Sequence, residues 1–174
     1  MYAQGKVVTT DTSGERDWIG NYNNSTSGGF VVGQYSSKHY VYSSNGGSTN
    51  NGTIEANVIY EHYASLTSSK GEILANGVSY TGSARNVTVT NTVTLFRRGD
   101  SNCYWKGKVY FARLWQDNTL KGDWRPCIQD SNGAIGMYDL VSNTFKTNSG
   151  SGSFIAGPEL AVGKGGGKSL PEEY

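Results

Sequence analysis

Aromatic residues beside asparagine-rich loops give this sequence its clearest chemical signal. The stretches 21–27 and 45–51 are rich in asparagine, serine and glycine, and aromatic residues stand close to both. An aromatic ring stacks on the C–H face of a sugar, while asparagine side chains and backbone amides bond its hydroxyl groups. The predicted sugar-binding residues are Trp18, Tyr22, Tyr35, Tyr40 and Tyr42. The competing interpretation assigns these rings to the hydrophobic core, because leucine is scarce in the chain.

Residues for hydrolysis do not occur in a workable pattern. A glycosidase that works from one strand needs carboxylates at alternate positions, Glu-x-Asp-x-Glu, so that acid and nucleophile share a face about 5 Å apart. That triplet is absent, and the nearest candidates, Glu55 and Glu61, are expected on the solvent side of a strand. His39 and His62 are isolated in the sequence, so we expect both at the surface. We therefore predict no catalytic residues and no enzyme activity.

Sites for nucleotides and metals are also predicted to be absent. Residues 167–169, Gly-Lys-Ser, resemble the end of a phosphate-binding loop, but that motif needs glycine where Val162 stands. Residues 130–133 and 11–17 offer oxygen ligands for a calcium ion, although such clusters are usually turns. The prediction is no cofactor and no metal, with calcium at these loops as the alternative.

Composition excludes further classes of function. The net charge is +1 and the sequence pI is about 7.7, so the chain lacks the basic surface that binds nucleic acid. It has no apolar run of about 18 residues for membrane insertion, and its first residues do not resemble a secretory signal. Cys103 and Cys127 are too few for a disulfide scaffold and lack the spacing of a zinc site. We expect two thiols, with one bridge as the alternative.

Local patterns predict strands joined by turns. The chain has 24 glycines and many short polar residues, which favour turns over helices. Residues 87–95 alternate apolar side chains with threonine, which is typical of a strand with one buried face. Asn-Gly at 76–77 predicts a two-residue hairpin, and residues 29–33 and 39–42 form a second predicted antiparallel pair. Residues 54–66 fit a strand or a helix; we expect a strand because β-branched residues are frequent there.

Motifs in the second half of the chain carry a family resemblance. They are Lys108-Val109-Tyr110-Phe111-Ala112-Arg113-Leu114-Trp115, Asp123-Trp124-Arg125-Pro126-Cys127, Ile135-Gly136-Met137-Tyr138-Asp139 and the glycine- and serine-rich residues 148–158. These motifs resemble the closing half of concanavalin A-like, laminin-G-like jelly-roll domains, of a kind found in phage and prophage virion proteins and in surface proteins of gut bacteria. The resemblance implies an all-β, antiparallel two-sheet jelly-roll sandwich, with Trp115 and Trp124 in packing roles.

The same resemblance bears on domain organisation. Members of the group open with a Leu-Pro-x-x-Tyr segment that leads into a first strand, and that opening strand is missing from the start of this chain. A similar segment, 170–174, stands instead at the far end, behind a glycine- and lysine-rich linker at 161–169. We therefore expect the sandwich at 1–160, followed at 161–174 by the linker and either the start of a next repeat or a strand-exchange tail.

The resemblance and the missing catalytic pattern together predict a function. We expect a non-catalytic module of a phage virion, such as a tail fibre or capsid decoration, or of a surface adhesin, located on the virion or the extracellular surface. Its expected partners are further copies of itself, other virion proteins and a cell-surface glycan. The alternative is a structural spacer or interaction module, in a repetitive surface or virion protein, that binds no ligand.

Overall fold

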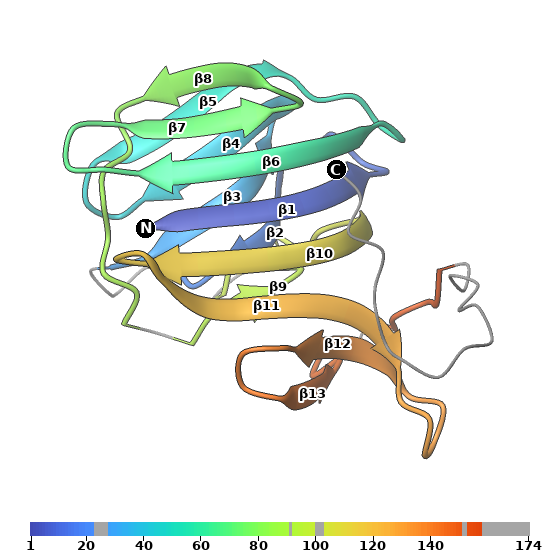
Figure 1. The fold of residues 1–174 in the computed structure, drawn as a ribbon. Helices are drawn as coiled ribbons and strands as arrows, with labels where there is room; N and C mark the ends of the chain where they lie inside the picture. Colours follow the sequence, from blue (N-terminus) through green and yellow to red (C-terminus); the bar gives the residue numbers. More distant parts are fainter. Residues whose placement is uncertain (23–27, 91, 100–102, 151–152, 158–174) are drawn as a thin grey trace.

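The computed structural model describes residues 1–22, 28–90, 92–99, 103–150 and 153–157, which form two antiparallel sheets (Figure 1). The larger sheet has eight strands in the order β13-β12-β11-β10-β1-β6-β7-β8, and the smaller has five in the order β5-β4-β3-β2-β9. No helix occurs in these ranges, so none of the described residues forms a helix that could span a bilayer. The predicted all-β, two-sheet antiparallel sandwich is confirmed.

The strand bounds follow the chain order. They are β1 Tyr2–Thr9, β2 Glu15–Gly20, β3 Phe30–Tyr35, β4 Lys38–Ser43, β5 Gly47–Thr53, β6 Ile59–Leu66, β7 Gly71–Ala75, β8 Val78–Gly82, β9 Thr94–Leu95, β10 Gly107–Gln116, β11 Thr119–Ile128, β12 Ile135–Asp139 and β13 Thr144–Thr147. Successive strands are mostly hairpin neighbours, and the exceptions carry the chain from one sheet to the other.

The first strand of the chain lies in the middle of the larger sheet. β1 pairs with β10 on one side and with β6 on the other. The amino group of Met1 donates to the Leu66 carbonyl at 3.2 Å and to Asn86 Oδ1 at 2.7 Å. The N-terminal strand is therefore paired on both sides, and the edges of the two sheets are formed by β13, β8, β5 and β9.

Two local predictions hold in detail. Asn76 and Gly77 both have positive φ, at 49° and 82°, as a two-residue hairpin turn between β7 and β8 requires. β6 is a strand from Ile59, and its burial alternates from residue to residue. The ambiguous stretch 54–66 is thus a strand only in its second part, because Asn57 adopts a left-handed φ of 65° and forms a turn first.

The strand predicted over 87–95 is wrong for most of its length. Only Thr94–Leu95 is a strand, and residues 84–90 cross the rim between the sheets as irregular chain. Their backbone groups bond to scattered partners: Arg85 N–H donates to Ser43 Oγ and Val89 N–H to Gln116 Oε1. Val87 is buried, while Thr88 and Thr90 are exposed. The alternation of apolar residues with threonine therefore reflects which side chains pack against the rim, and not pairing with a neighbouring strand.

The core lies between the sheets around Trp18, Phe30, Ile19, Ile54, Leu66, Ile73 and Leu114. Trp18 reaches across to β1, where a Cβ atom on Gly5 would lie 2.7 Å from the indole ring. Glycine at position 5 therefore makes room for the largest core side chain. Trp124 packs against this core, as the resemblance implies.

His39 and His62, predicted at the surface, are both buried in the core. They face each other from opposite sheets, with His39 Nδ1 3.0 Å from His62 Nε2. Trp18 Nε1–H donates to His62 Nδ1 at 3.2 Å, so a neutral His62 carries its proton on Nε2 and donates to His39. His39 is bonded in turn to the Thr53 backbone. Burial lowers the pKa of His39 to about 4 and that of His62 to about 3. We call Trp18, His62 and His39 the histidine chain.

Candidate functional site

The outer face of the five-stranded sheet collects four of the predicted sugar-binding residues. Tyr40 and Tyr42 alternate on β4 with the buried His39 and Val41, so both hydroxyphenyl groups point away from the core. Tyr35 ends β3 and is 42% exposed. Tyr22 follows β2 and is half-buried. We call Tyr22, Tyr35, Tyr40 and Tyr42 the tyrosine row.

Neighbouring rings of the tyrosine row are in contact. The ring centroids of Tyr35 and Tyr40 are 5.5 Å apart, and those of Tyr40 and Tyr42 are 6.4 Å apart with the planes at 23°. Tyr22 meets Tyr42 edge-on at 5.0 Å and an interplanar angle of 80°. These contacts hold the rings in fixed relative positions, which lowers the entropy that a ligand stacked on them would have to restrict.

Charged side chains border this aromatic face. The Arg98 guanidinium lies 5.2 Å from the centroid of the Tyr22 ring, and its Nη1 is 3.3 Å from Glu15 Oε2. Burial raises the pKa of the Tyr40 and Tyr42 hydroxyls, and the negative charges of Glu15 and Asp17 raise that of Tyr40 further. Both hydroxyls are therefore neutral at physiological pH and can donate a hydrogen bond.

Trp18 was predicted as a fifth member of this face, and that prediction is wrong. Its side chain is fully buried between the sheets and cannot touch a ligand on the outer surface. Asp17 and Trp18 are neighbours on β2 and so point to opposite faces, Asp17 outward and Trp18 inward. A bulge between Asp17 and Ile19 then places Ile19 in the core beside Trp18.

The asparagine-rich loops contribute mainly to structure. Asn21 Oδ1 accepts a hydrogen bond from the Phe30 N–H, and Asn45 Nδ2 donates to the Asn86 carbonyl. Residues 23–27 of the first loop lie outside the described residues. Asn50 pairs with Tyr40 across β4 and β5, and its buried Oδ1 accepts no hydrogen bond from the described part of the chain. Asn50 belongs to β5 rather than to a loop, and its buried Oδ1 is closed to a ligand on the tyrosine row.

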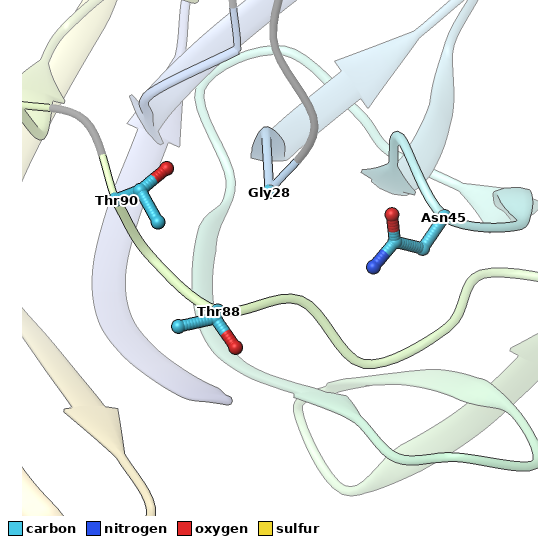
Figure 2. A pocket seen from close by; sticks show the side chains of 4 residues that line it. All are labelled: Gly28, Asn45, Thr88 and Thr90. Carbon is cyan, nitrogen blue, oxygen red and sulfur yellow. The ribbon is translucent and has the colours of Figure 1, made fainter.

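A small hollow lies at the rim of the sandwich (Figure 2). It has a volume of about 220 Å³ and is lined by Gly28, Asn45, Thr88 and Thr90. Gly28 adjoins Gly29, whose backbone packs against the Tyr22 ring. The volume is below the roughly 300 Å³ at which small-molecule pockets usually begin, so the hollow suits a single polar group better than a whole ligand.

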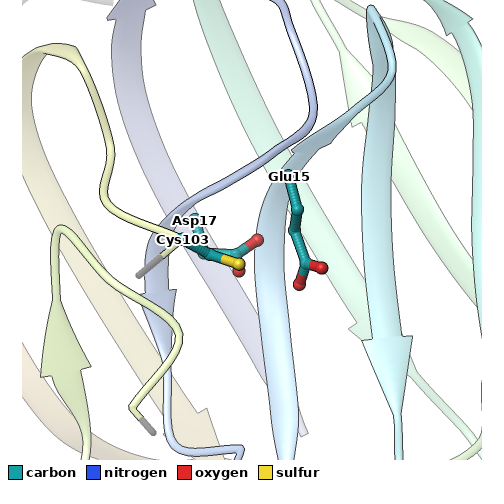
Figure 3. A group of neighbouring side chains, drawn as sticks. All are labelled: Glu15, Asp17 and Cys103. Atoms are coloured by element: carbon teal, nitrogen blue, oxygen red, sulfur yellow. The ribbon is translucent and has the colours of Figure 1, made fainter. Parts of the chain in front are cut away.

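A cluster of acidic and thiol groups lies beneath the same face (Figure 3). Glu15 and Asp17 stand at alternate positions of β2, and Cys103 comes from the segment that precedes β10. One ligand atom of each residue lies within 4.8 Å of the others. Glu15 and Asp17 thus match the first two carboxylates of the Glu-x-Asp-x-Glu pattern. The sequence analysis missed this pair, although its i, i+2 spacing on a predicted strand could have revealed it. Asp17 is fully buried, so it is closed to a substrate in this structure.

The other residues singled out from the sequence have ordinary surroundings. Glu55 is exposed in the loop before β6, and Glu61 on β6 pairs with Lys6 at 3.7 Å. Residues 130–133 form the turn between β11 and β12. Asp11 is held by Arg16 and Lys106 at 3.0 and 2.8 Å, so two cations already occupy the carboxylate proposed for calcium. 

The two cysteines are separate thiols rather than one bridge. Both side chains are half-buried, and burial raises the pKa of the Cys127 thiol. Cys127 lies on β11 of the larger sheet, whereas Cys103 lies against β2 of the smaller one. The expectation of two thiols is confirmed.

A second aromatic group was missed by the sequence analysis. Tyr2, Tyr63 and Trp115 meet on the outer face of the larger sheet, with ring centroids 6.2 Å apart for Tyr2 and Tyr63 and 4.9 Å apart for Tyr2 and Trp115. Trp115 therefore packs on the surface of the sheet and not in the core. The three residues belong to β1, β6 and β10, which are far apart in sequence, so only the sheet order reveals the group.

No family model matches this chain, and no curated protein is found that resembles it.

Proposed function

We propose that this protein is a non-catalytic module of a phage virion or surface assembly that binds a cell-surface glycan through the tyrosine row. The observation that carries the proposal is the gathering of Tyr22, Tyr35, Tyr40 and Tyr42 on one outer face, from three separate segments of chain. Rings that are partly exposed and mutually packed form a platform on which sugar rings stack.

Polar groups beside the rings supply partners for sugar hydroxyls. The hydroxyls of Tyr40 and Tyr42 are donors, and Glu15 and Arg98 stand at the border of the row. An open platform buries only part of a ligand, so we expect weak affinity for one glycan, roughly millimolar to micromolar in Kd. Several copies in one assembly would raise the avidity without new contacts.

The assembly context is supported by fold and sequence motifs together. The sandwich is compatible with a jelly roll, and the residues that resemble concanavalin A-like domains fall on β10, β11 and β12, which are neighbours in the larger sheet. We propose membership of that fold group and a place in a repetitive virion or surface structure. Light scattering after size-exclusion chromatography tests self-association: oligomers are expected, and a stable 18.8 kDa monomer at high concentration would contradict them.

A glycan array followed by calorimetry tests the binding surface. Tyr40→Ala is expected to weaken binding by on the order of 1 kcal/mol, about a fivefold rise in Kd, because a stacking face is lost. Tyr35→Ala should act in the same direction. The matched control is Tyr110→Ala on the larger sheet, since Tyr110 is 41% exposed and Tyr35 is 42% exposed.

Three results would overturn the proposal. An array without hits, from protein shown to be folded, would leave the structural spacer as the better interpretation. Loss of affinity in Tyr110→Ala but not in Tyr40→Ala would move the site to the other sheet. Release of reducing sugar that Glu15→Gln abolishes would show that the module is a hydrolase.

A further inference from the structure

Asp17 is a buried carboxylate whose charge is only partly compensated, because the nearby Arg98 opposes the larger effects of burial and of Glu15. Its side chain has no exposed surface, and neither carboxylate oxygen accepts a hydrogen bond from any group in the described ranges. A buried carboxylate without hydrogen bonds or a counterion is strongly destabilising, so native proteins rarely retain one without a partner. Burial and the nearby charge of Glu15 raise the pKa of Asp17 well above its usual range.

The backbone around Asp17 is shaped to admit this carboxylate. Gly33, its pairing partner on β3, has no side chain, and a Cβ atom there would lie 2.7 Å from Asp17 Oδ1. On the other side, Asp17 N–H donates to the Cys103 carbonyl at 3.2 Å, which fixes the thiol-bearing segment beside β2. Main-chain pairing thus holds Asp17 and Cys103 next to each other.

The three functional groups converge on one point. Figure 3 shows the Asp17 carboxylate and the Cys103 sulfur side by side, with the Glu15 side chain next to them on the same strand as Asp17. One oxygen of each acid and the sulfur lie within 4.8 Å of one another. Tetrahedral Zn²⁺ with bonds of about 2.3 Å to sulfur and 2.0–2.2 Å to oxygen needs ligand separations of roughly 3.3–3.6 Å. Side-chain movements on the order of 1 Å would achieve that geometry.

We propose that Glu15, Asp17 and Cys103 bind a divalent transition-metal ion, with Zn²⁺ as the best fit. Two carboxylates and a thiolate carry three negative charges, and Arg98 beside Glu15 supplies one positive charge. A bound divalent cation would bring the net charge of these groups to zero. A thiolate ligand suits Zn²⁺ and is foreign to Ca²⁺ and Mg²⁺, which take oxygen ligands. Three protein ligands leave a fourth position for water.

The consequence for the fold is a tie between distant parts of the chain. Cys103 precedes β10 of the larger sheet, whereas Glu15 and Asp17 belong to β2 of the smaller one. A metal ion at this point would fasten the segment that carries Cys103 to the sheet beneath it. The proposed metal site is independent of sugar binding, because metal binding is measured directly.

Metal uptake by the reduced, chelator-treated full chain tests the site. Co²⁺ should bind and give an intense thiolate-to-metal charge-transfer band with the visible spectrum of a tetrahedral ion, and Zn²⁺ should displace it. Calorimetry should show Zn²⁺ binding with a stoichiometry of one. Ca²⁺ and Mg²⁺ serve as controls and should not compete.

Variants separate this site from any other thiol. Cys103→Ser should abolish the charge-transfer band and raise the Zn²⁺ Kd at least tenfold, and Asp17→Asn should raise it similarly. Cys127→Ser is the matched control and should leave both unchanged. Circular dichroism of each metal-free variant checks that the fold is intact.

Other outcomes would overturn the proposal. If Co²⁺ gives no charge-transfer band with the native chain, the three residues do not bind a transition metal, and a proton shared by Glu15 and Asp17 is the better account. A band that persists in Cys103→Ser and disappears in Cys127→Ser would place the metal elsewhere. Competition by Ca²⁺ would exclude a thiolate site.

Discussion

The histidine chain and the acidic cluster of Glu15, Asp17 and Cys103 are both groups of polar side chains removed from solvent. They differ in whether hydrogen bonds within the protein satisfy the buried polar atoms. In the histidine chain, each donor meets an acceptor from Trp18 through His62 to His39 and on to the Thr53 backbone. In the acidic cluster, Asp17 has no hydrogen-bond donor from the described residues. The first cluster lies between the sheets and the second beneath the outer face of the smaller sheet.

The difference separates a structural role from a binding role. A chain of hydrogen bonds that satisfies every ring nitrogen links the two sheets at a fixed register, and neutral histidine carries no charge to be compensated. A carboxylate without a partner destabilises the metal-free fold, so it is explained only by a ligand or by a proton that neutralises it. Substitutions should therefore act in opposite directions in the two regions.

Removal of the central histidine should have the largest effect. His62→Ala leaves a cavity and strips partners from both Trp18 Nε1 and His39 Nδ1, so we expect a loss of about 3–5 kcal/mol in the free energy of unfolding. Urea denaturation followed by tryptophan fluorescence measures it. Tyr63→Ala on the same strand, on the outer face of the sheet, is the control and should lose much less. Equal losses would mean that the histidine chain adds nothing beyond ordinary packing.

Acid should weaken the fold through the same chain. The pKa of the buried histidines falls from 6.5 to about 4 for His39 and about 3 for His62, so the unfolded state binds protons first as pH drops. Their stability contribution is complete above pH 6.5 and is lost progressively as the pH falls toward these lower values. Between about pH 7 and pH 5 we expect a loss of about 2 kcal/mol for each histidine.

Urea midpoints across this pH range measure the effect. His39→Asn removes one of the two titrating groups and should roughly halve the slope of stability against pH. A native chain whose stability is flat from about pH 7 to pH 5 would contradict the buried neutral pair.

The contrast also shows what the sequence could and could not reveal. The hairpin at Asn76 and Gly77 was predictable because a two-residue turn is a local event, with both φ values set by adjacent residues. Alternation on β4 was a usable signal that the sequence analysis did not apply: it places Tyr40 and Tyr42 on one face and His39 on the other. The histidine chain was not predictable, because His39 and His62 meet only when the two sheets are stacked, and each looks isolated in its own strand.

Trp18 and the acidic cluster show a second limit. The bulge in β2 places the consecutive residues Trp18 and Ile19 both in the core, and no local pattern marks where a strand will bulge. Cys103 reaches the cluster through a parallel bridge between Asp17 and Tyr104, a pairing of segments far apart in the chain. The residues of the candidate sugar site were thus largely visible in the sequence, whereas the proposed metal site depends on tertiary pairing.

In the acidic cluster, the expected change has the opposite sign. Asp17→Asn keeps the shape of the side chain and removes the buried charge, so the metal-free protein should gain about 1–3 kcal/mol in unfolding free energy at a pH high enough to ionise Asp17. The gain should shrink as the pH falls, because the raised pKa of Asp17 means that protonation neutralises the native side chain at lower pH.

Asp139→Asn is the matched control for that substitution. The Asp139 carboxylate accepts hydrogen bonds from the N–H groups of Asp123 and Val141 and from the Ser142 hydroxyl, and its pKa is lowered. Its replacement should destabilise the fold by about 1–3 kcal/mol. A loss of stability in both variants would show that Asp17 has a partner that satisfies its charge.

The smallest change in stability is expected for Glu15→Gln, because two effects oppose each other there. The substitution removes the ion pair with Arg98, at 3.3 Å between partly exposed groups, which contributes at most about 1 kcal/mol. It also removes the negative charge that raises the pKa of Asp17.

We expect the stability of the metal-free protein to change by less than about 1 kcal/mol, while the pKa of Asp17 falls. Carboxyl-detected NMR titration of the native and variant chains measures that pKa directly. A loss of stability as large as that of His62→Ala, with the pKa of Asp17 unchanged, would show that Glu15 anchors the fold and that its charge does not reach Asp17.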